Sequence, residues 1–436
     1  MSKKAETLSQ IHNTFKLSPI EKEDLGDYYV ENSHVRSYEN IRKDIAETLK
    51  NSHGSNEQIL FTGYRGCGKS TELNYLEKEL EDHLLALNFS IQKELNALHL
   101  NYIEIFILLM EKLFKHAKDN DLKISNTYIE LIKQWAGTRE IKEINDKYIG
   151  IDIQAGAEGS AGIPGIFKFF TKLRANAKNS RSLKEVLTVN IEPRLSELID
   201  LCNDLIAEIK KCNKSDILII IEDIDKIPFA DAKELFFNYI SVLTDLKTNI
   251  IYTFPFALYH NPQFNTISSY FDMRMVLPMI KVKQRDNNEN AEGIAVMQEM
   301  VSRRMDLSLF ESRDLLNELI LMSGGVIRDL FRMIKDAARS AADEKITKRD
   351  ITNAINYLKR DYANNIGDID FDGQKYSADS FYKALVTLVR NPAKSIDNTN
   401  EELLLLQNLS ILGYNGENWY DVHPVIRRIL EERKKL

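Results

Sequence analysis

Apolar and polar positions alternate in blocks along this chain, and the blocks predict strands and helices in turn. Short, unbroken apolar runs predict buried strands at residues 58–62, 84–89, 217–221, 249–254 and 275–277. Apolar residues three and four positions apart predict helices at residues 37–50, 70–81, 102–117, 128–135, 192–211 and 230–243. Apolar strands that alternate with helices indicate a parallel sheet covered on both faces. We therefore expect an α/β fold with a three-layer core.

Other stretches of the chain depart from this pattern. Residues 150–165 hold five of the chain's 18 glycines, which predicts an inserted loop or hairpin. Residues 290–362 are helical in pattern, with no clear strand. The end of the chain predicts two helices (377–389 and 400–409), a turn, a short segment at 419–422 and a terminal helix. We expect an N-terminal segment with a leading helix (1–56), a core (57–285) with an insertion at about 150–184, a helical part (286–365) and a C-terminal module (374–436).

Composition narrows the class of protein. The 436 residues are 43% hydrophobic and 28% charged, which excludes general disorder. Three cysteines are too few for a disulfide framework or a four-ligand metal site. No apolar run approaches the roughly 20 residues that a bilayer requires, and no apolar stretch follows the N-terminal lysines, so we expect a cytoplasmic protein without a transmembrane segment. The net charge of −7 disfavours a protein coated with cations for nucleic acid.

One motif carries clear chemistry. The pattern G-x-x-x-x-G-K-[ST] lies between a predicted strand and a predicted helix, the context in which it forms a phosphate-binding loop. Its residues are Gly63, Tyr64, Arg65, Gly66, Cys67, Gly68, Lys69 and Ser70, followed by Thr71. The backbone N–H groups of such a loop surround an anion beside a helix N-terminus. We expect Lys69 to reach the β- and γ-phosphates of ATP and the Ser70 hydroxyl to bind Mg²⁺.

Acidic residues follow the predicted strand at 217–221. Glu222 is placed to support Mg²⁺, directly or through water, and Asp223 is placed to polarise an attacking water. Most ATPases with such a phosphate-binding loop have Asp first and Glu second at this strand end, whereas here Glu222 precedes Asp223. Because a misplacement of about 1 Å can cost about 100-fold in rate, we expect slow hydrolysis of ATP.

With both motifs in place, the chain resembles the additional-strand P-loop ATPases, in particular the AAA+ and STAND ATPases. The run from Ser323 to Arg328 resembles the Gly-Gly-x-x-Arg start of their lid helix. The resemblance implies that Arg328 senses the γ-phosphate and that Thr253 orients the attacking water. It implies that Arg274 is an arginine finger for a neighbouring subunit, although Arg285, Arg303 and Arg304 compete for that role. Val35 and Arg36 resemble the adenine-side Gly-Arg box without its glycine, so base contacts stay open.

The same resemblance implies a helical lid and a C-terminal winged-helix domain at residues 374–436. Several segments resemble bacterial STAND-like proteins of conflict and defence systems, which implies a possible antiviral role. The expected function is an ATP-binding, oligomerising switch or scaffold that controls a partner protein. The alternative is an ATP-dependent DNA-binding or DNA-loading remodeller.

A basic stretch bears on the nucleic-acid alternative. Residues 159–184 contain no acid, and the phenylalanines among them run beside its cations at helical spacing. The cations are Lys168, Lys172, Arg174, Lys178, Arg181 and Lys184. Such a helix can serve nucleic acid, an anionic membrane surface or a partner subunit, or it can fold onto the core with its lysines in solvent. The C-terminal module has nine Lys/Arg against eight Asp/Glu, and its helix at 400–409 carries acids and no base, which favours protein contact over DNA reading.

Overall fold

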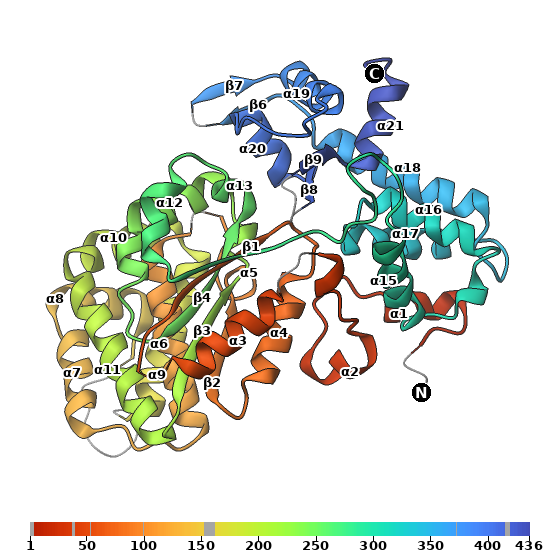
Figure 1. Cartoon of the computed structure of the whole chain (residues 1–436). Coiled ribbons are helices and arrows are strands. Elements are labelled where there is room, and N and C mark those ends of the chain that lie inside the picture. Colours follow the sequence, from red (N-terminus) through yellow and green to blue (C-terminus); the bar gives the residue numbers. More distant parts are fainter. Residues whose placement is uncertain are drawn as a thin grey trace.

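The computed structural model describes residues 4–36, 40–52, 54–98, 100–151, 162–371, 373–414 and 419–436 (Figure 1). A parallel sheet of five strands lies at its centre, in the spatial order β2-β3-β4-β1-β5. The strands are β1 (Gln58–Gly63), β2 (Leu84–Ser90), β3 (Asp216–Glu222), β4 (Asn249–Pro255) and β5 (Met273–Leu277). Each covers its predicted stretch and extends it by up to two residues at an end, so the predicted α/β fold is confirmed.

The sheet is buried on both faces, as the continuous apolar runs predict. Along β3, Leu218 and Ile220 pack into one hydrophobic core, while Ile217, Ile219 and Ile221 pack into a second. All five side chains are fully buried. The first core includes α3 (Ile41–Asn51) and α4 (Lys69–Glu79), and the second includes α6 (Tyr102–Asp119), α11 (Leu195–Asn213) and α12 (Phe229–Leu243).

Further helices thicken the layer that contains α6 (Figure 1). They are α5 (Ile91–Glu94), α7 (Asn126–Ala136), α8 (Arg139–Ile144), α9 (Ile163–Asn179) and α10 (Arg181–Ile191). Of the expected glycine-rich hairpin, residues 152–161 lie outside the described residues. The part that follows is integrated into the core, since Phe170 of α9 stacks with Phe114 and Trp135 at ring-centroid distances of 5.9 and 6.1 Å.

Short helices α13 (Phe256–Tyr259) and α14 (Phe264–Ile267) connect β4 to β5, and four helices that pack together follow β5. These four, which we call the α15–α18 bundle, are α15 (Ala291–Ser302), α16 (Arg313–Ser323), α17 (Ile327–Ser340) and α18 (Lys348–Asn364). They match the helical pattern at residues 290–362. Gly324 and Gly325 separate α16 from α17 with φ of 62° and 88°, values that favour glycine.

The described residues of the C-terminal module (374–436), together with strand β6 before it, pack above the sheet and the bundle (Figure 1). The helices are α19 (Ala378–Arg390), α20 (Asn400–Gln407) and α21 (Pro424–Glu432). Two antiparallel hairpins accompany these helices. The strands β6 (Ile369–Phe371) and β7 (Gln374–Tyr376) precede α19, and β8 (Ile411–Tyr414) and β9 (Trp419–Val422) lie between α20 and α21. The sequence did not predict β6 and β7, because three-residue strands with mostly exposed side chains leave no apolar run.

The N-terminal segment, residues 4–36, runs between the sheet and the α15–α18 bundle (Figure 1). It contains α1 (Ile11–Thr14) and α2 (Leu25–Tyr28). Ile11, Phe15 and Val30 are buried, and the Ala5 main chain exchanges hydrogen bonds of 2.8 Å with the bundle. The sequence predicted only a polar, mixed segment here, because four-residue helices are too short to show a period.

Candidate nucleotide-binding site

The glycine loop between β1 and α4 needs each of its three glycines. Gly66 and Gly68 have φ of 80° and 109°, a backbone conformation that side chains strain. A Cβ on Gly66 would lie 2.8 Å from the Cβ of Arg328, and one on Gly63 would lie 2.6 Å from the Leu277 carbonyl oxygen. The loop is therefore closely covered from two sides, and α4 begins at Lys69 with its N-terminus directed at the loop.

Lys69 is the cation of this loop, and its side chain is only 7% exposed. Its ammonium Nζ donates to the carbonyl oxygens of Gly63 and Tyr64, at 2.8 and 3.0 Å. It also forms an ion pair of 2.9 Å with Oδ2 of Asp225. A phosphate bound by Lys69 has to compete with these three oxygens.

Asp225 is a site residue to which the sequence assigned no role. It lies just after β3, is 4% exposed and lines the cavity beside the loop. Burial raises the pKa of a carboxyl, but the ammonium groups of Lys69 and Lys226 outweigh burial here and hold the pKa of Asp225 below its ordinary value. Arg65 donates to the Asp225 carbonyl oxygen, at 3.1 Å from Nη2. The repeated acids at 222–225 were the signal in the sequence.

Glu222, the expected metal-supporting acid, ends β3 and does not line the cavity, so that role stays a prediction. Nδ2 of Asn88 donates to its Oε1 at 2.9 Å. Burial raises the pKa of Glu222 above its ordinary value, and the Ser70 and Asn88 side chains oppose that shift. Asn88 was missed by the sequence reading, although a polar residue inside an otherwise apolar strand was the available signal.

Asp223, the expected general base, makes two contacts within the chain. Lys226 forms an ion pair with its Oδ1, and the Ser90 hydroxyl donates to its Oδ2. The residue has a φ of 69°, which is uncommon for a side-chain-bearing residue and turns the chain sharply after β3. Asp223 does not line the cavity, and its role as base stays a prediction.

Thr253 and Arg274 also lie outside the cavity lining. The Thr253 hydroxyl donates to the Ile221 carbonyl oxygen at 3.3 Å and accepts from the Ile224 amide at 3.2 Å, so it ties β4 to the end of β3. Arg274 is exposed on β5, an edge strand of the sheet. The water-orienting role of Thr253 and the in-trans role of Arg274 stay predictions.

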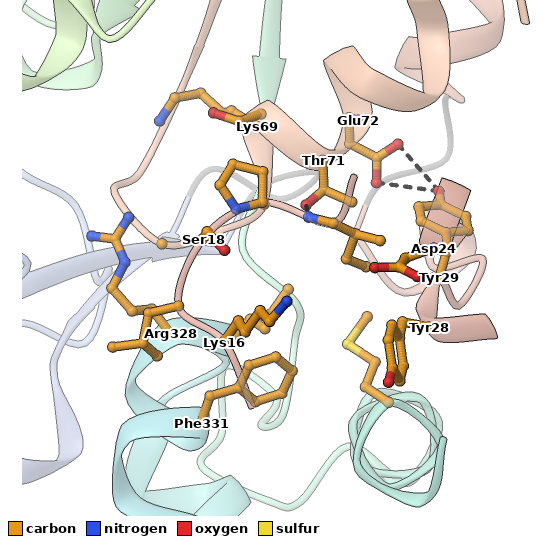
Figure 2. A pocket seen from close by; sticks show the side chains of 18 of the residues that line it. Lys16, Ser18, Asp24, Tyr28, Tyr29, Lys69, Thr71, Glu72, Arg328 and Phe331 are labelled. Atoms are coloured by element: carbon orange, nitrogen blue, oxygen red, sulfur yellow. Dashed lines mark hydrogen bonds between the residues drawn. The ribbon is translucent and has the colours of Figure 1, made fainter. Parts of the chain in front are cut away.

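A cavity of about 250 Å³ lies against the phosphate loop. Loop and α4 residues line one side, the α15–α18 bundle lines another, and the N-terminal segment lines a third. Figure 2 shows Lys69, Arg328 and Phe331, together with Lys16 and Tyr28 of the N-terminal segment, arranged around it. The sequence-predicted Arg328 therefore lies in the cavity lining with Lys69 and Ser70, as the lid resemblance implies.

The wall formed by the N-terminal segment was not foreseen from sequence. The Ile20 amide donates to Oγ1 of Thr71 at 3.2 Å, and Asn74 donates back to the Ile20 carbonyl oxygen at 2.8 Å. The Tyr29 hydroxyl donates to the Glu72 carboxylate at 3.1 Å (Figure 2). These contacts hold the segment across the first turns of α4, beside the loop.

Arg36 fastens the end of this segment to the loop itself. It is 3% exposed, and its guanidinium donates to the carbonyl oxygen of Cys67 at 2.6 Å and to that of Pro278. Cys67 is buried, as expected for a small residue in the loop. Arg36 also lines the cavity, while the base contacts that the sequence left open stay open.

Of the six cations named in the basic stretch, three pair with acids within the chain and two donate to backbone carbonyl oxygens. Arg174 pairs with Glu111, Lys184 with Glu104 at 2.9 Å and Arg181 with Glu185 at 3.4 Å. Lys172 and Lys178 donate to backbone carbonyl oxygens. Phe169, Phe170 and Leu173 are buried. These contacts favour the reading in which α9 and α10 fold onto the core, over a surface for nucleic acid.

Two searches over the described residues gave negative results. No helix in those ranges is long and apolar enough to cross a membrane. In the same part of the chain, no group of three or more His, Cys, Asp or Glu side chains is arranged to hold a metal ion.

The strand, glycine loop, helix and acidic strand end are together the elements of a P-loop NTPase. The model of the KAP family P-loop domain matches residues 38–254, which extend from before α3 into β4. Over these residues the chain is similar to the KAP family P-loop domain. The resemblance in the sequence named the wider class of P-loop ATPases but not this family.

Comparison with solved structures found similar folds at low identity. The Walker-type ATPase PABY2304 of Pyrococcus abyssi has a TM-score of 0.43 and 13% identity over 96% of this chain and 99% of that chain. Aeropyrum pernix Orc1, solved in complex with DNA, has a TM-score of 0.40 and 11% identity over 95% and 97%. Cdc6p from Pyrobaculum aerophilum has a TM-score of 0.39 and 10% identity over 97% and 98%. Such low scores assign no partner or activity here. No curated protein matches the chain in sequence.

Proposed function

We propose that this protein binds Mg-ATP in the cavity beside the glycine loop and acts as a nucleotide-gated switch of the AAA+/STAND type. The observation that carries the proposal is the composition of that cavity. Lys69 and Ser70 from the loop and Arg328 from the α15–α18 bundle line the same space of about 250 Å³. A ligand that contacts both the loop and the bundle stabilises the arrangement in which the two lie against each other.

The side chains present fit a nucleotide with Mg²⁺. The Ser70 side chain acts on the pKa of the Glu222 carboxyl and also lines the cavity, so a hydroxyl with an acid beside it is available for the ion. Lys69 and the loop amides would hold phosphate oxygens, and Arg328 would contact the terminal phosphate from the bundle, which would act as a lid. When bound, Mg²⁺ supplies charge neutralisation at the phosphates.

We propose that hydrolysis is slow. Asp223 is the candidate base, and its two carboxylate oxygens are engaged by Lys226 and Ser90. Because these contacts hold a carboxylate that does not line the cavity, the base has to reorient before it can accept a proton from a water at the phosphates. A steady-state turnover above about 10 per second, measured as phosphate release by the isolated protein, would contradict this proposal.

The output of such a switch is proposed to be assembly or control of a partner protein, as in the defence-related proteins that the sequence resembles. The C-terminal module is proposed to be a winged helix that contacts protein. Its helix α20 begins with Glu401 and Glu402 and contains no Lys or Arg, which suits a protein surface better than a phosphate backbone. A DNA-loading role has the weaker support, because the cations of α9 and α10 are mostly engaged within the chain.

The test is the mass of the particle in solution with ATP, with ADP and without nucleotide. We expect a larger particle with ATP than with ADP, because a switch that oligomerises requires a difference between the two states. The control is Lys69→Ala, which should give one mass in all three conditions. A wild-type protein of constant mass that nevertheless binds ATP would refute oligomerisation as the output.

A further inference from the structure

The side chain of Tyr64, in the glycine loop, is buried beside the C-terminal module. It is 1% exposed and does not line the cavity. Its ring packs on Phe256 at a centroid distance of 4.2 Å with an interplanar angle of 43°. In a phosphate loop this position has no required residue type, so phosphate binding alone does not explain a large buried aromatic side chain here.

The β8–β9 hairpin closes directly over the Tyr64 hydroxyl. A Cβ on Gly413 of β8 would lie 2.8 Å from that hydroxyl oxygen and 3.0 Å from the ring of Tyr420 in β9. The hairpin therefore has no room to approach further, and it has a glycine at the point of closest contact. A movement of Tyr64 toward the hairpin therefore has to be matched by a movement of the hairpin.

The same hairpin also contacts the turn that precedes Arg328. The Tyr414 hydroxyl donates to the Gly324 carbonyl oxygen at 3.1 Å, and Leu412 would lie 2.7 Å from a Cβ on Gly324. One residue after Arg328, Asp329 contacts Nε2 of the buried His423 at 3.3 Å. The C-terminal module is thus packed against both the phosphate loop and the start of α17.

The backbone of Tyr64 links this packing to phosphate. Its carbonyl oxygen accepts a hydrogen bond of 3.0 Å from the Lys69 ammonium, so Lys69 helps to hold Tyr64 in its present position. If Lys69 turns to a bound phosphate, it gives up at least part of that bond. The loss acts on the residue whose ring lies beneath the hairpin.

We propose that Tyr64 couples phosphate binding in the loop to the position of the β8–β9 hairpin, and that the packing of the hairpin in turn sets nucleotide affinity. The inference rests on the proposed nucleotide site. The reciprocal effect follows because a coupling free energy acts equally in both directions. The position of the hairpin in the C-terminal module thereby depends on whether phosphate is bound in the loop of the same chain.

The first arm of the test uses fluorescence. The chain has two tryptophans, and Trp419 stacks on Tyr414 in this hairpin at 4.3 Å. In the Trp135→Phe variant Trp419 is the only tryptophan, so emission under selective excitation of tryptophan reports on the hairpin. We expect ADP to change that emission with the same midpoint as its binding isotherm, measured separately by calorimetry. Calorimetric binding with unchanged Trp419 emission would overturn the coupling, whereas no binding would overturn the nucleotide site itself.

The second arm uses affinity and keeps both tryptophans. Gly413→Ala should weaken ADP binding by about fivefold or more, although Gly413 lies outside the cavity lining. Adding Tyr64→Phe to this variant removes the crowded hydroxyl and should restore much of the affinity, a non-additive result. Tyr252→Phe is the matched control, because it removes a buried hydroxyl from strand β4 that is bonded to Leu243 at the end of α12. An unchanged affinity in Gly413→Ala, or no recovery in the double variant, would overturn the proposal.

Discussion

Replacing Asp225 by asparagine should make the nucleotide-free protein less stable and make ADP bind more tightly. In the present structure the Asp225 carboxylate forms an ion pair with the Lys69 ammonium at 2.9 Å. Both side chains are less than a tenth exposed. Asparagine has the same shape but no charge, so the variant removes the ion pair and leaves the packing in place.

The magnitude follows from the distance and the burial. Two unit charges 2.9 Å apart attract by about 6 kcal/mol at an effective dielectric constant of 20. Desolvation offsets part of this attraction, and breaking a buried pair by removing one partner costs about 3–5 kcal/mol. Lys69 keeps two carbonyl partners, so we expect the lower end, about 3 kcal/mol in the free energy of unfolding. Since phosphate no longer competes with a carboxylate, ADP affinity should rise by roughly tenfold, or about 1.4 kcal/mol.

Urea unfolding and calorimetric titration with ADP measure the two effects, and ADP avoids turnover during the experiment. Asp223→Asn is the control, because it removes an equal charge two residues away that pairs with Lys226 instead of Lys69. That variant should not tighten ADP binding. An Asp225→Asn protein that is as stable as the wild type and binds ADP no better would refute the competition between Asp225 and phosphate.

Three further predictions concern other parts of the molecule. Burial lowers the pKa of His260 from 6.5 to about 4, so the folded state resists its protonation. This contribution to the free energy of unfolding is full above pH 6.5 and should fall by about 2–3 kcal/mol on going to pH 4.5. Urea unfolding should show a smaller loss in His260→Gln. Phe15 is fully buried and packs edge-on against Phe331 at 5.1 Å, so Phe15→Ala should release the N-terminal segment and speed its proteolysis, while Leu17→Ala, at a side chain 43% exposed, should not. A charge-reversed α9 variant combines Lys168→Glu, Lys172→Glu and Lys178→Glu. It should bind ATP by calorimetry and assemble by particle mass as the wild type does, whereas altered assembly would indicate a contact surface on α9.

The sheet and the phosphate loop were predictable because their causes are local in sequence. A strand buried on both faces has to be apolar throughout, as residues 217–221 are. Gly66 and Gly68 are needed for conformations that glycine favours, so they stand out in the sequence. The position of Arg328 beside the loop could be expected because the Gly324–Gly325 turn before it has a recognisable sequence.

The rest of the site was not predictable because it depends on contacts between residues far apart in the chain. The N-terminal segment has no periodic pattern of its own and is held by bonds such as that from Tyr29 to Glu72. The pairing of Asp225 with Lys69 depends on the order of strands in the sheet, in which only β4 separates β3 from β1, and apolar runs do not specify that order. For the same reason the sequence could not show that Tyr64 lies beneath the β8–β9 hairpin.

Calorimetric titration of the wild-type protein with ATP and Mg²⁺ tests the central claim most directly, because it measures binding whether or not hydrolysis is fast. We expect saturable binding of one nucleotide per chain, its loss in Lys69→Ala, and in Arg328→Ala a larger loss of affinity for ATP than for ADP. A wild-type protein that takes up no nucleotide, or a Lys69→Ala variant that binds as tightly as the wild type, would contradict the nucleotide site.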